Sequence, residues 1–279
     1  CCQPIPPGFA ASQQGLGALK ESLHSLTPLP VTSTTSTEGQ PQVHGIAPHG
    51  GTLVDLRVPP EQVAAVKAGV DRVLECSDRN ACDVELLMVG GFSPLRGFMH
   101  EEDYLAVVSG HRTTSGLLFG LPVVMDTDDD TIAPGDRLLL TYRGQDLAVF
   151  TVESRWEPDK VREAAGCYGT TSIEHPAVRM ICGERGRFYL GGALQGLELP
   201  RRVFPCQTPA EVRSQLPASE DVVAFQCRNP IHRAHYELFT RALHATNVSA
   251  NAVVLVHPTC GPTQEDDIAG EVYATFADH

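Results

Sequence analysis

The pattern of apolar and polar positions divides the chain into three stretches of different character. Residues 1–42 are rich in Pro, Ser, Thr and Gln and carry only three charged side chains, Lys20, Glu21 and Glu38. Such a stretch buries too little apolar surface to offset the entropy lost on ordering. We therefore expect a disordered leader or linker over residues 1–42, with ordered structure from about Gly45.

Residues 43–205 have the pattern of a β-rich domain. A helix is expected over Pro59–Val70, where prolines open an amphipathic run. Short runs of β-type residues separated by turn signals fill Leu121–Trp156. Another pair of strands is expected over Arg187–Leu199, around Gly191-Gly192. Together these segments indicate a compact domain whose strands are joined by short turns.

Residues 206–279 show a different period, typical of an α/β domain. A helix is expected within Pro205–Leu216. A buried-type strand at Asp221–Phe225, a helix at His232–His244 and a second strand at Asn251–Val256 then form one βαβ unit, whose crossover implies parallel pairing. A single unit leaves both sheet edges open, so we expect this α/β domain to be incomplete within the chain.

Composition and charge narrow the classes of function. The chain has 279 residues, with 21 Lys and Arg against 34 Asp and Glu, and a net charge of −13 makes a surface that repels nucleic acid. No apolar run approaches the ~20 residues of a membrane span. The nine cysteines contain no Cys-x-x-Cys pair, which argues against a zinc ribbon and a thioredoxin-type site, and their odd number argues against a secreted disulfide framework. No signal peptide is visible. We expect a protein that binds neither nucleic acid nor membrane and is not secreted.

Four features of the first domain are predicted to be structural. An apolar segment at Val84–Val89 follows a polar turn, and Gly90–Met99 is a loop punctuated by Gly and Pro. Asp126–Asp130 carries four carboxylates but lacks the glycine and distal Glu of a calcium-binding loop, so a solvated turn is expected. Trp156 is expected in the core.

The most informative chemistry lies in Gln226–His235, which joins the first strand of the βαβ unit to its helix. Ligands of open α/β sheets bind beyond the carboxyl ends of strands, where a helix N-terminus offers unpaired N–H groups to phosphate. Asn229-Pro230 suits the turn. His232 and His235 fall on one face of the first helical turn, beside Arg228. Two imidazoles and an arginine there form a candidate anion clamp.

The spacing of the two histidines alone leaves three roles open, namely metal ligation, phosphate contact, and helix capping or packing. A metal would need a third ligand, for which His257 at the end of the next strand is available. No carboxylate or cysteine falls at metal-site spacing near the pair. We therefore expect no metal held by the protein.

The ten residues Gln226–His235 resemble the Gln-x-Arg-Asn-Pro-x-His-Arg-Ala-His motif of the ATP sulfurylase family. Other segments resemble the same family in the same order: Ala47–Leu56 (APHGGTLVDL), Gly90–Met99 (GGFSPLRGFM), Tyr168–Val178 (YGTTSIEHPAV) and His257–Ile268 (HPTCGPTQEDDI). The resemblance covers roughly Gly45–His279 and leaves the leader outside.

The resemblance implies an N-terminal PUA-like β-rich domain followed by a Rossmann-like α/β nucleotidylyltransferase domain. The family joins sulfate to ATP, forming adenosine 5′-phosphosulfate and pyrophosphate, the first step of sulfate assimilation. The resemblance further implies Mg²⁺ carried by ATP rather than by the protein, and a homo-oligomer. It also implies a fused or separate adenylylsulfate kinase as partner and a cytoplasmic or plastid location.

By matching positions, the resemblance also implies roles for individual residues. Sulfate would be bound by Gln226 and Arg228. ATP would be contacted by Gln226, Asn229, His232 and His235, and catalysis would depend on Cys227, Arg228 and Asn229. Sulfate is a poor nucleophile, so these groups would position it in line with the α-phosphorus and neutralise the leaving pyrophosphate.

Two departures from the family pattern bear on activity. The family has Thr between Gln and Arg, where this chain has Cys227, a weaker hydrogen-bond donor. The family's later Gly-Arg-Asp-His-Ala-Gly loop, which contacts ATP and sulfate, does not occur in this sequence, so the chain holds part of the expected site. Two other functions therefore stay open: a different adenylyltransferase that uses the same histidine pair, and a noncatalytic protein that binds sulfate or nucleotide.

Overall fold

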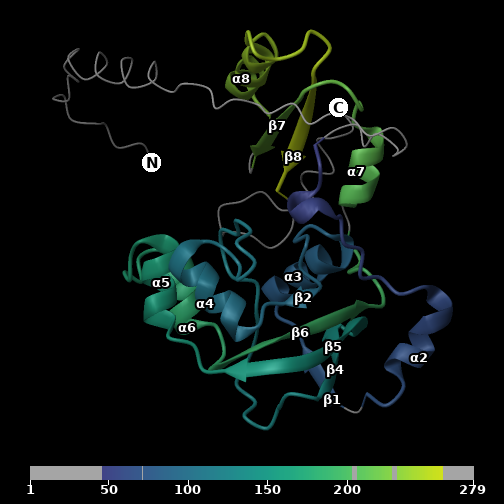
Figure 1. Cartoon of the computed structure of the whole chain (residues 1–279), viewed down its shortest axis with the longest axis vertical. Coiled ribbons are helices and arrows are strands. Elements are labelled where there is room, and N and C mark those ends of the chain that lie inside the picture. Colours follow the sequence, from purple (N-terminus) through teal and green to yellow (C-terminus); the bar gives the residue numbers. More distant parts are fainter. Residues whose placement is uncertain (1–45, 71, 203–205, 228–230, 260–279) are drawn as a thin grey trace, which may run out of the picture. The chain divides into compact units, whose positions relative to one another are not determined.

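The computed structural model describes residues 46–70, 72–202, 206–227 and 231–259. Their strands form two sheets, a six-stranded mixed sheet in the first domain and a two-stranded parallel sheet in the second (Figure 1). The leader expected over residues 1–42 lies outside the described residues. None of the described helices is both long and apolar enough to cross a membrane.

The first domain is built on the six-stranded sheet. Its strands lie in the order β1-β4-β5-β6-β2, and β3 also pairs with β6. β1 and β4 are parallel, whereas β4, β5, β6, β2 and β3 pair in antiparallel fashion. The strands are β1 (Arg72–Glu75), β2 (Gly97–Phe98), β3 (Met125–Thr127), β4 (Arg137–Tyr142), β5 (Gln145–Trp156) and β6 (Phe188–Gly196). The strands expected within Leu121–Trp156 are confirmed as β3, β4 and β5.

The first domain also contains short helices. They are η1 (His49–Gly51), η2 (Pro60–Gln62), α2 (Val63–Lys67), α3 (Asp78–Val89), α4 (Glu101–Gly110), α5 (Lys160–Tyr168) and α6 (Pro176–Gly183). Helix α5 packs against both α4 and α6, and the three lie beside the sheet (Figure 1). The helix expected over Pro59–Val70 is confirmed as η2 and α2, and it ends three residues early, at Lys67.

Helix α3 begins inside the stretch that the sequence pattern assigns to a polar turn. The Ser77 side chain caps it by accepting a hydrogen bond from the Asn80 backbone N–H at 3.1 Å. The helix ends at Gly90, whose φ of 83° is the left-handed conformation that glycine adopts readily. The expected apolar segment Val84–Val89 is therefore the second half of α3, the half that turns its apolar side chains into the core.

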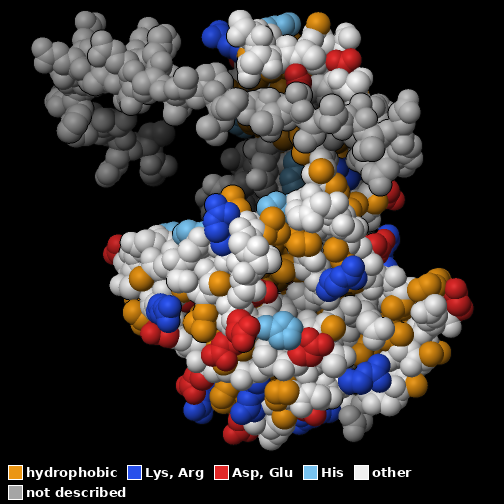
Figure 2. Space-filling view, viewed as in Figure 1, with side chains coloured by type: hydrophobic (Ala, Val, Ile, Leu, Met, Phe, Trp, Pro, Cys, Tyr) orange, Lys and Arg blue, Asp and Glu red, His pale blue; other side chains and the backbone are white. Residues whose placement is uncertain are grey.

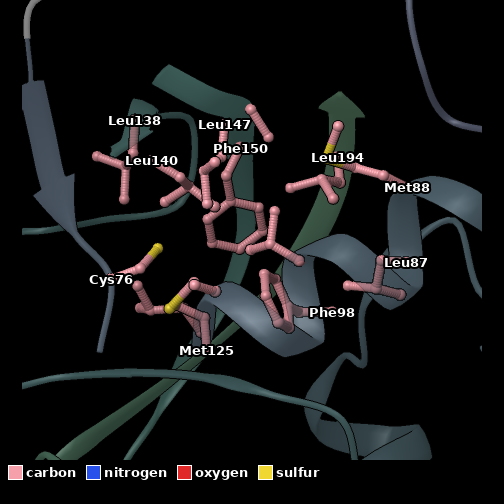
Figure 3. Packing of buried hydrophobic residues seen from close by; sticks show 14 of the residues in the cluster. Cys76, Leu87, Met88, Phe98, Met125, Leu138, Leu140, Leu147, Phe150 and Leu194 are labelled. Atoms are coloured by element: carbon pink, nitrogen blue, oxygen red, sulfur yellow. The ribbon is translucent and has the colours of Figure 1, made fainter. Parts of the chain in front are cut away.

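The core of the domain lies between α3 and the sheet. Leu87 and Met88 of α3 pack with Phe98 and Phe150, whose rings meet edge to face at 5.3 Å (Figure 3). Phe98 comes from the segment Gly90–Met99, which therefore contributes to the core of the first domain. A second cluster gathers Tyr104, Trp156 and Tyr189, with ring centroids 5.4 to 6.0 Å apart. The expected core position of Trp156 is confirmed.

The predicted pair of strands around Gly191-Gly192 is wrong, because β6 runs through both glycines without a turn. A Cβ atom on Gly191 would lie 2.2 Å from the Met99 carbonyl oxygen, and one on Gly192 would lie 2.1 Å from that of Thr151. Beside them, β5 carries a register irregularity between Val152 and Ser154. Glycine is needed here because neighbouring backbones approach closely, and not because the chain reverses.

Asp83 on α3 is expected to lower the stability of the fold at neutral pH. Burial raises the pKa of its carboxyl from the ordinary 3.8 to about 6, although Arg185 and Arg79 act in the opposite direction. Because the folded state binds the proton more tightly than the unfolded chain, ionisation at neutral pH destabilises the fold. We expect Asp83→Asn to raise the free energy of unfolding by about 1–3 kcal/mol near neutral pH.

The gain in the free energy of unfolding from Asp83→Asn should shrink as pH falls below about 6. It should vanish below the unfolded pKa of 3.8, where the Asp83 carboxyl is protonated in both the folded and the unfolded state. Denaturant unfolding of wild type and variant across this range measures the difference. A gain that is independent of pH would contradict the assignment.

The second domain contains the expected βαβ unit. Its elements are α7 (Pro209–Gln215), β7 (Val222–Cys227), α8 (Arg233–Leu243) and β8 (Val253–Pro258). The two strands are parallel and in register from Val222 beside Val253 to Cys227 beside Pro258. The helix expected within Pro205–Leu216 is confirmed as α7, which opens with a capping box between Thr208 and Glu211.

Candidate active site

The candidate site lies where β7 and β8 end and α8 begins. Gln226 and Cys227 are the last residues of β7, and they lie beside His257 and Pro258 of β8 in the parallel register. His232 is the N-cap residue of α8. Carboxyl strand ends and a helix N-terminus thus meet at one edge of the unit, which is the usual ligand position in α/β sheets.

His232 and His235 stack on each other at the start of α8. Their ring centroids are 3.8 Å apart with an interplanar angle of 28°. The His232 side chain makes no capping hydrogen bond to the helix. The Nδ1 atom of His235 is buried and has no hydrogen-bond partner among the residues that the structure describes. The pair therefore retains hydrogen-bonding capacity at the positive end of the helix dipole, where an anion is favoured.

Aromatic packing against β7 supports His235 of this pair. The Phe225 ring on β7 contacts His235 at 5.2 Å and Phe239 of α8 at 5.8 Å between centroids. Phe225 therefore points toward α8. Because side chains alternate along a strand, Gln226 points to the opposite sheet face.

The two strand-end residues of β7 differ in their surroundings. Gln226 is exposed, and its Nε2 donates a hydrogen bond to Thr259 Oγ1 at 3.3 Å. Cys227 is buried, with 7% of its surface exposed, and its carbonyl accepts a hydrogen bond from the Thr259 backbone N–H at 2.8 Å. Sequence reasoning missed Thr259, because its contact with Gln226 depends on the register between two strands that are 33 positions apart.

Arg228 and Asn229 lie outside the described residues, so their placement beside the histidines stays a prediction. The same holds for the roles assigned to Gln226, Cys227, His232 and His235. The four described residues of the six predicted fall at the same edge of the βαβ unit.

The described residues offer no cluster of three or more His, Cys, Asp or Glu side chains that could hold a metal ion. The acidic turn of the first domain uses its carboxylates for backbone contacts. Asp126 accepts from the Gly186 N–H at 2.7 Å, Asp128 from Arg187 at 2.8 Å and Asp129 from Thr131 at 2.8 Å. Asp128, Asp129 and Asp130 are exposed, as expected for a solvated turn.

Charge is mixed on the face of the first domain that is visible in Figure 2. Figure 2 shows Lys and Arg side chains scattered among Asp and Glu over the visible face of the first domain. This visible face has no continuous basic stripe of the kind that tracks a nucleic-acid backbone.

Comparison with known proteins identifies the two parts of the chain. A family model for the PUA-like domain matches residues 46–199, and the ATP-sulfurylase family model matches residues 205–278. The PUA-like domain followed by an α/β unit is the fold class that the sequence predicts.

Named relatives agree with these models. The sulfate adenylyltransferase of Candida albicans is 39% identical over 244 residues, covering 79% of this chain and 46% of the relative. That of Schizosaccharomyces pombe is 43% identical over 204 residues, covering 69% and 41%. A solved structure, a hexameric APS kinase from Thiobacillus denitrificans, is 28% identical with a TM-score of 0.60, covering 80% of this chain and 41% of that one.

This chain spans less than half the length of these relatives. The two family models nevertheless follow each other along it in order, and the second includes the strand ends and the histidine pair. On these grounds the chain belongs to the ATP-sulfurylase family.

Proposed function

We propose that this chain carries part of the active site of a sulfate adenylyltransferase, which joins sulfate to ATP and releases pyrophosphate. The observation that carries the proposal is the stacked pair His232 and His235 at the start of α8, beside the end of β7. This pair lies within the segment that the ATP-sulfurylase model matches.

In the proposed reaction a sulfate oxygen attacks the α-phosphorus of ATP, and the bond between that phosphorus and the bridging oxygen of pyrophosphate breaks. The electron pair of that bond leaves with pyrophosphate. The residues act by positioning and charge stabilisation. Gln226 and Arg228 hold sulfate, Asn229 and the two histidines contact the ATP phosphates, and the histidines stabilise the charge that develops on the leaving group.

The chemistry of the described donors agrees with a phosphate site rather than a protein-held cation. The strand ends present an amide, a hydroxyl and imidazoles, whereas Mg²⁺ prefers carboxylate oxygens. We therefore assign Mg²⁺ to the incoming nucleotide, where it neutralises charge on the phosphates.

Cys227 stands where the family has Thr. Its side chain is buried, so the position contributes to substrate binding through its backbone or through a thiol at the edge of the site. A thiol is a weak donor, which favours the backbone.

Two further proposals concern the setting of the enzyme. The similar structure is named a hexameric APS kinase, and we propose that the present protein also self-associates and that an adenylylsulfate kinase, fused or separate, consumes its product. Cys76, Cys82 and Cys167 carry thiols without disulfides, which supports a reducing compartment, the cytoplasm or the plastid.

Pyrophosphate release tests the proposed function. The full-length protein is incubated with Mg-ATP, with and without sulfate, and we expect release that depends on sulfate. Release that requires a phosphorylated organic acceptor instead would indicate another adenylyltransferase. Calorimetric binding of ATP or sulfate without any product would indicate a noncatalytic binding protein.

A further inference from the structure

Thr259 lies one residue beyond β8 and contacts both final residues of β7. Its backbone N–H donates to the Cys227 carbonyl at 2.8 Å, which extends the parallel ladder by one step. Its Oγ1 accepts a hydrogen bond from Gln226 Nε2 at 3.3 Å. We propose that Thr259 is a positioning residue for sulfate, which acts by holding the amide of Gln226. The proposal rests on the proposed function, because it assigns sulfate to Gln226.

The amide of Gln226 has two N–H donors and one carbonyl acceptor. With one N–H committed to Thr259, the second remains available to an anion. A glutamine as exposed as Gln226 would otherwise sample several rotamers, including those that present its carbonyl oxygen to the anion. The bond to Thr259 selects an orientation before sulfate arrives, so less side-chain entropy is lost on binding.

The backbone hydrogen bond between Thr259 and Cys227 keeps the Thr259 hydroxyl in place beside Gln226. A hydroxyl contact alone would leave the main chain of Thr259 unattached to β7. The 2.8 Å bond from its N–H to Cys227 instead fixes its main chain against the strand that carries Gln226. The hydroxyl and the amide therefore belong to one rigid edge, which is the requirement for a positioning group.

The ligand of the Gln226 amide that Thr259 holds is expected to be sulfate and not the nucleotide. Phe225 packs against His235, so the preceding strand position faces α8 and the histidine pair. Gln226 points to the other sheet face, beside His257 in the register. Donors from the two faces thus approach the strand ends separately, the histidines for the ATP phosphates and Gln226 with Thr259 for the second anion.

Replacing the Thr259 hydroxyl tests the proposal. Thr259→Val keeps the side-chain shape and removes the acceptor, and Thr259→Ser keeps the acceptor. Loss of one neutral hydrogen bond predicts a rise of about fivefold in the KM for sulfate with Thr259→Val. The KM for ATP and kcat should stay within about twofold, and Thr259→Ser should restore the sulfate KM. Thr240→Val, the same substitution in α8, is the matched control and should leave every parameter unchanged.

A double-mutant cycle with Gln226→Ala separates positioning from a general structural effect. If Thr259 acts through Gln226, Thr259→Val has no further effect on the sulfate KM in the Gln226→Ala background. Additive effects, equal changes in the KM for ATP, or failure of Thr259→Ser to rescue would overturn the proposal.

The dissociation constant for sulfate, measured calorimetrically on the same variants, distinguishes failure of this proposal from failure of the proposed function. Absence of sulfate-dependent turnover in the wild type counts against the proposed function alone. In that case the calorimetric comparison still decides the role of Thr259, with the same fivefold loss of affinity expected for Thr259→Val and no loss overturning it.

Discussion

Replacing Arg228 by alanine is expected to lower turnover about 100-fold or more, with the thermal stability of the protein unchanged. Arg228 follows the last residue of β7 in the sequence and carries the only permanent charge among the six predicted site residues. Two anions, sulfate and the ATP phosphates, must approach each other at this edge. Without the guanidinium, their mutual repulsion is no longer offset in the transition state, and a charge-assisted contact to sulfate is lost.

Arg241→Ala is the matched control for this prediction. Arg241 lies in the last turn of α8, is 84% exposed and pairs with Glu237 at 3.8 Å. Its removal changes the net charge by the same amount, far along α8 from the strand ends. Comparable losses of kcat in the two variants would show that overall charge, and not a specific contact, governs turnover. Near-normal kcat with Arg228→Ala would contradict the site assignment.

Removal of Glu163 is expected to cause the largest loss of stability. Its carboxylate is 2% exposed and accepts hydrogen bonds at 3.0 Å from the hydroxyls of both Tyr104 and Tyr189. The Arg185 guanidinium, itself 12% exposed, lies 3.3 Å from its other oxygen. Glu163 thereby ties α5 to α4, to β6 and to the segment that follows α6.

Glu163→Ala leaves the buried Arg185 charge without its carboxylate and removes the acceptor of two tyrosines. We expect a loss of about 3–5 kcal/mol in the free energy of unfolding, measured by denaturant titration. Glu157→Ala is the control, since Glu157 pairs with Arg187 at 3.1 Å with both side chains more than half exposed. That change should cost at most about 1 kcal/mol. Equal losses in the two variants would show that burial of the Glu163–Arg185 pair does not increase its contribution to the free energy of unfolding.

Much of the fold follows from local pattern. The strands of the βαβ unit are short continuous apolar runs, and their parallel pairing follows from the helix between them. Strands β4 and β5 are bounded by turn residues that can be recognised in the sequence. Helix α3 is only half visible, because its first turn is made of Asp78, Arg79 and Asn80, residues that also compose loops, and the Ser77 cap becomes informative only once the helix exists.

The pair Gly191-Gly192 illustrates the limit of local reasoning. Two adjacent glycines favour a turn when read alone. In the structure they lie within β6, where the backbones of Met99 and Thr151 leave no space for a Cβ atom. The requirement comes from strands that are distant in sequence, so no local pattern contains it.

The candidate site also combines features that local sequence predicts with features that depend on strand pairing. The positions of Gln226, Cys227 and the two histidines at one strand-to-helix join are predictable because these residues share one contiguous motif. The support of His235 by Phe225 and the contact of Thr259 with Gln226 arise from side-chain alternation and from strand register. Both depend on pairing across the unit, which the motif alone does not specify.

Transfer of radiolabelled sulfate into an adenylated product tests the central claim most directly. The full-length protein, incubated with Mg-ATP and labelled sulfate, is expected to form adenosine 5′-phosphosulfate in amounts equal to the pyrophosphate released, and Arg228→Ala is expected to lower both together about 100-fold or more. Pyrophosphate released without label in a nucleotide product, or labelled product that persists undiminished in Arg228→Ala, would contradict the account.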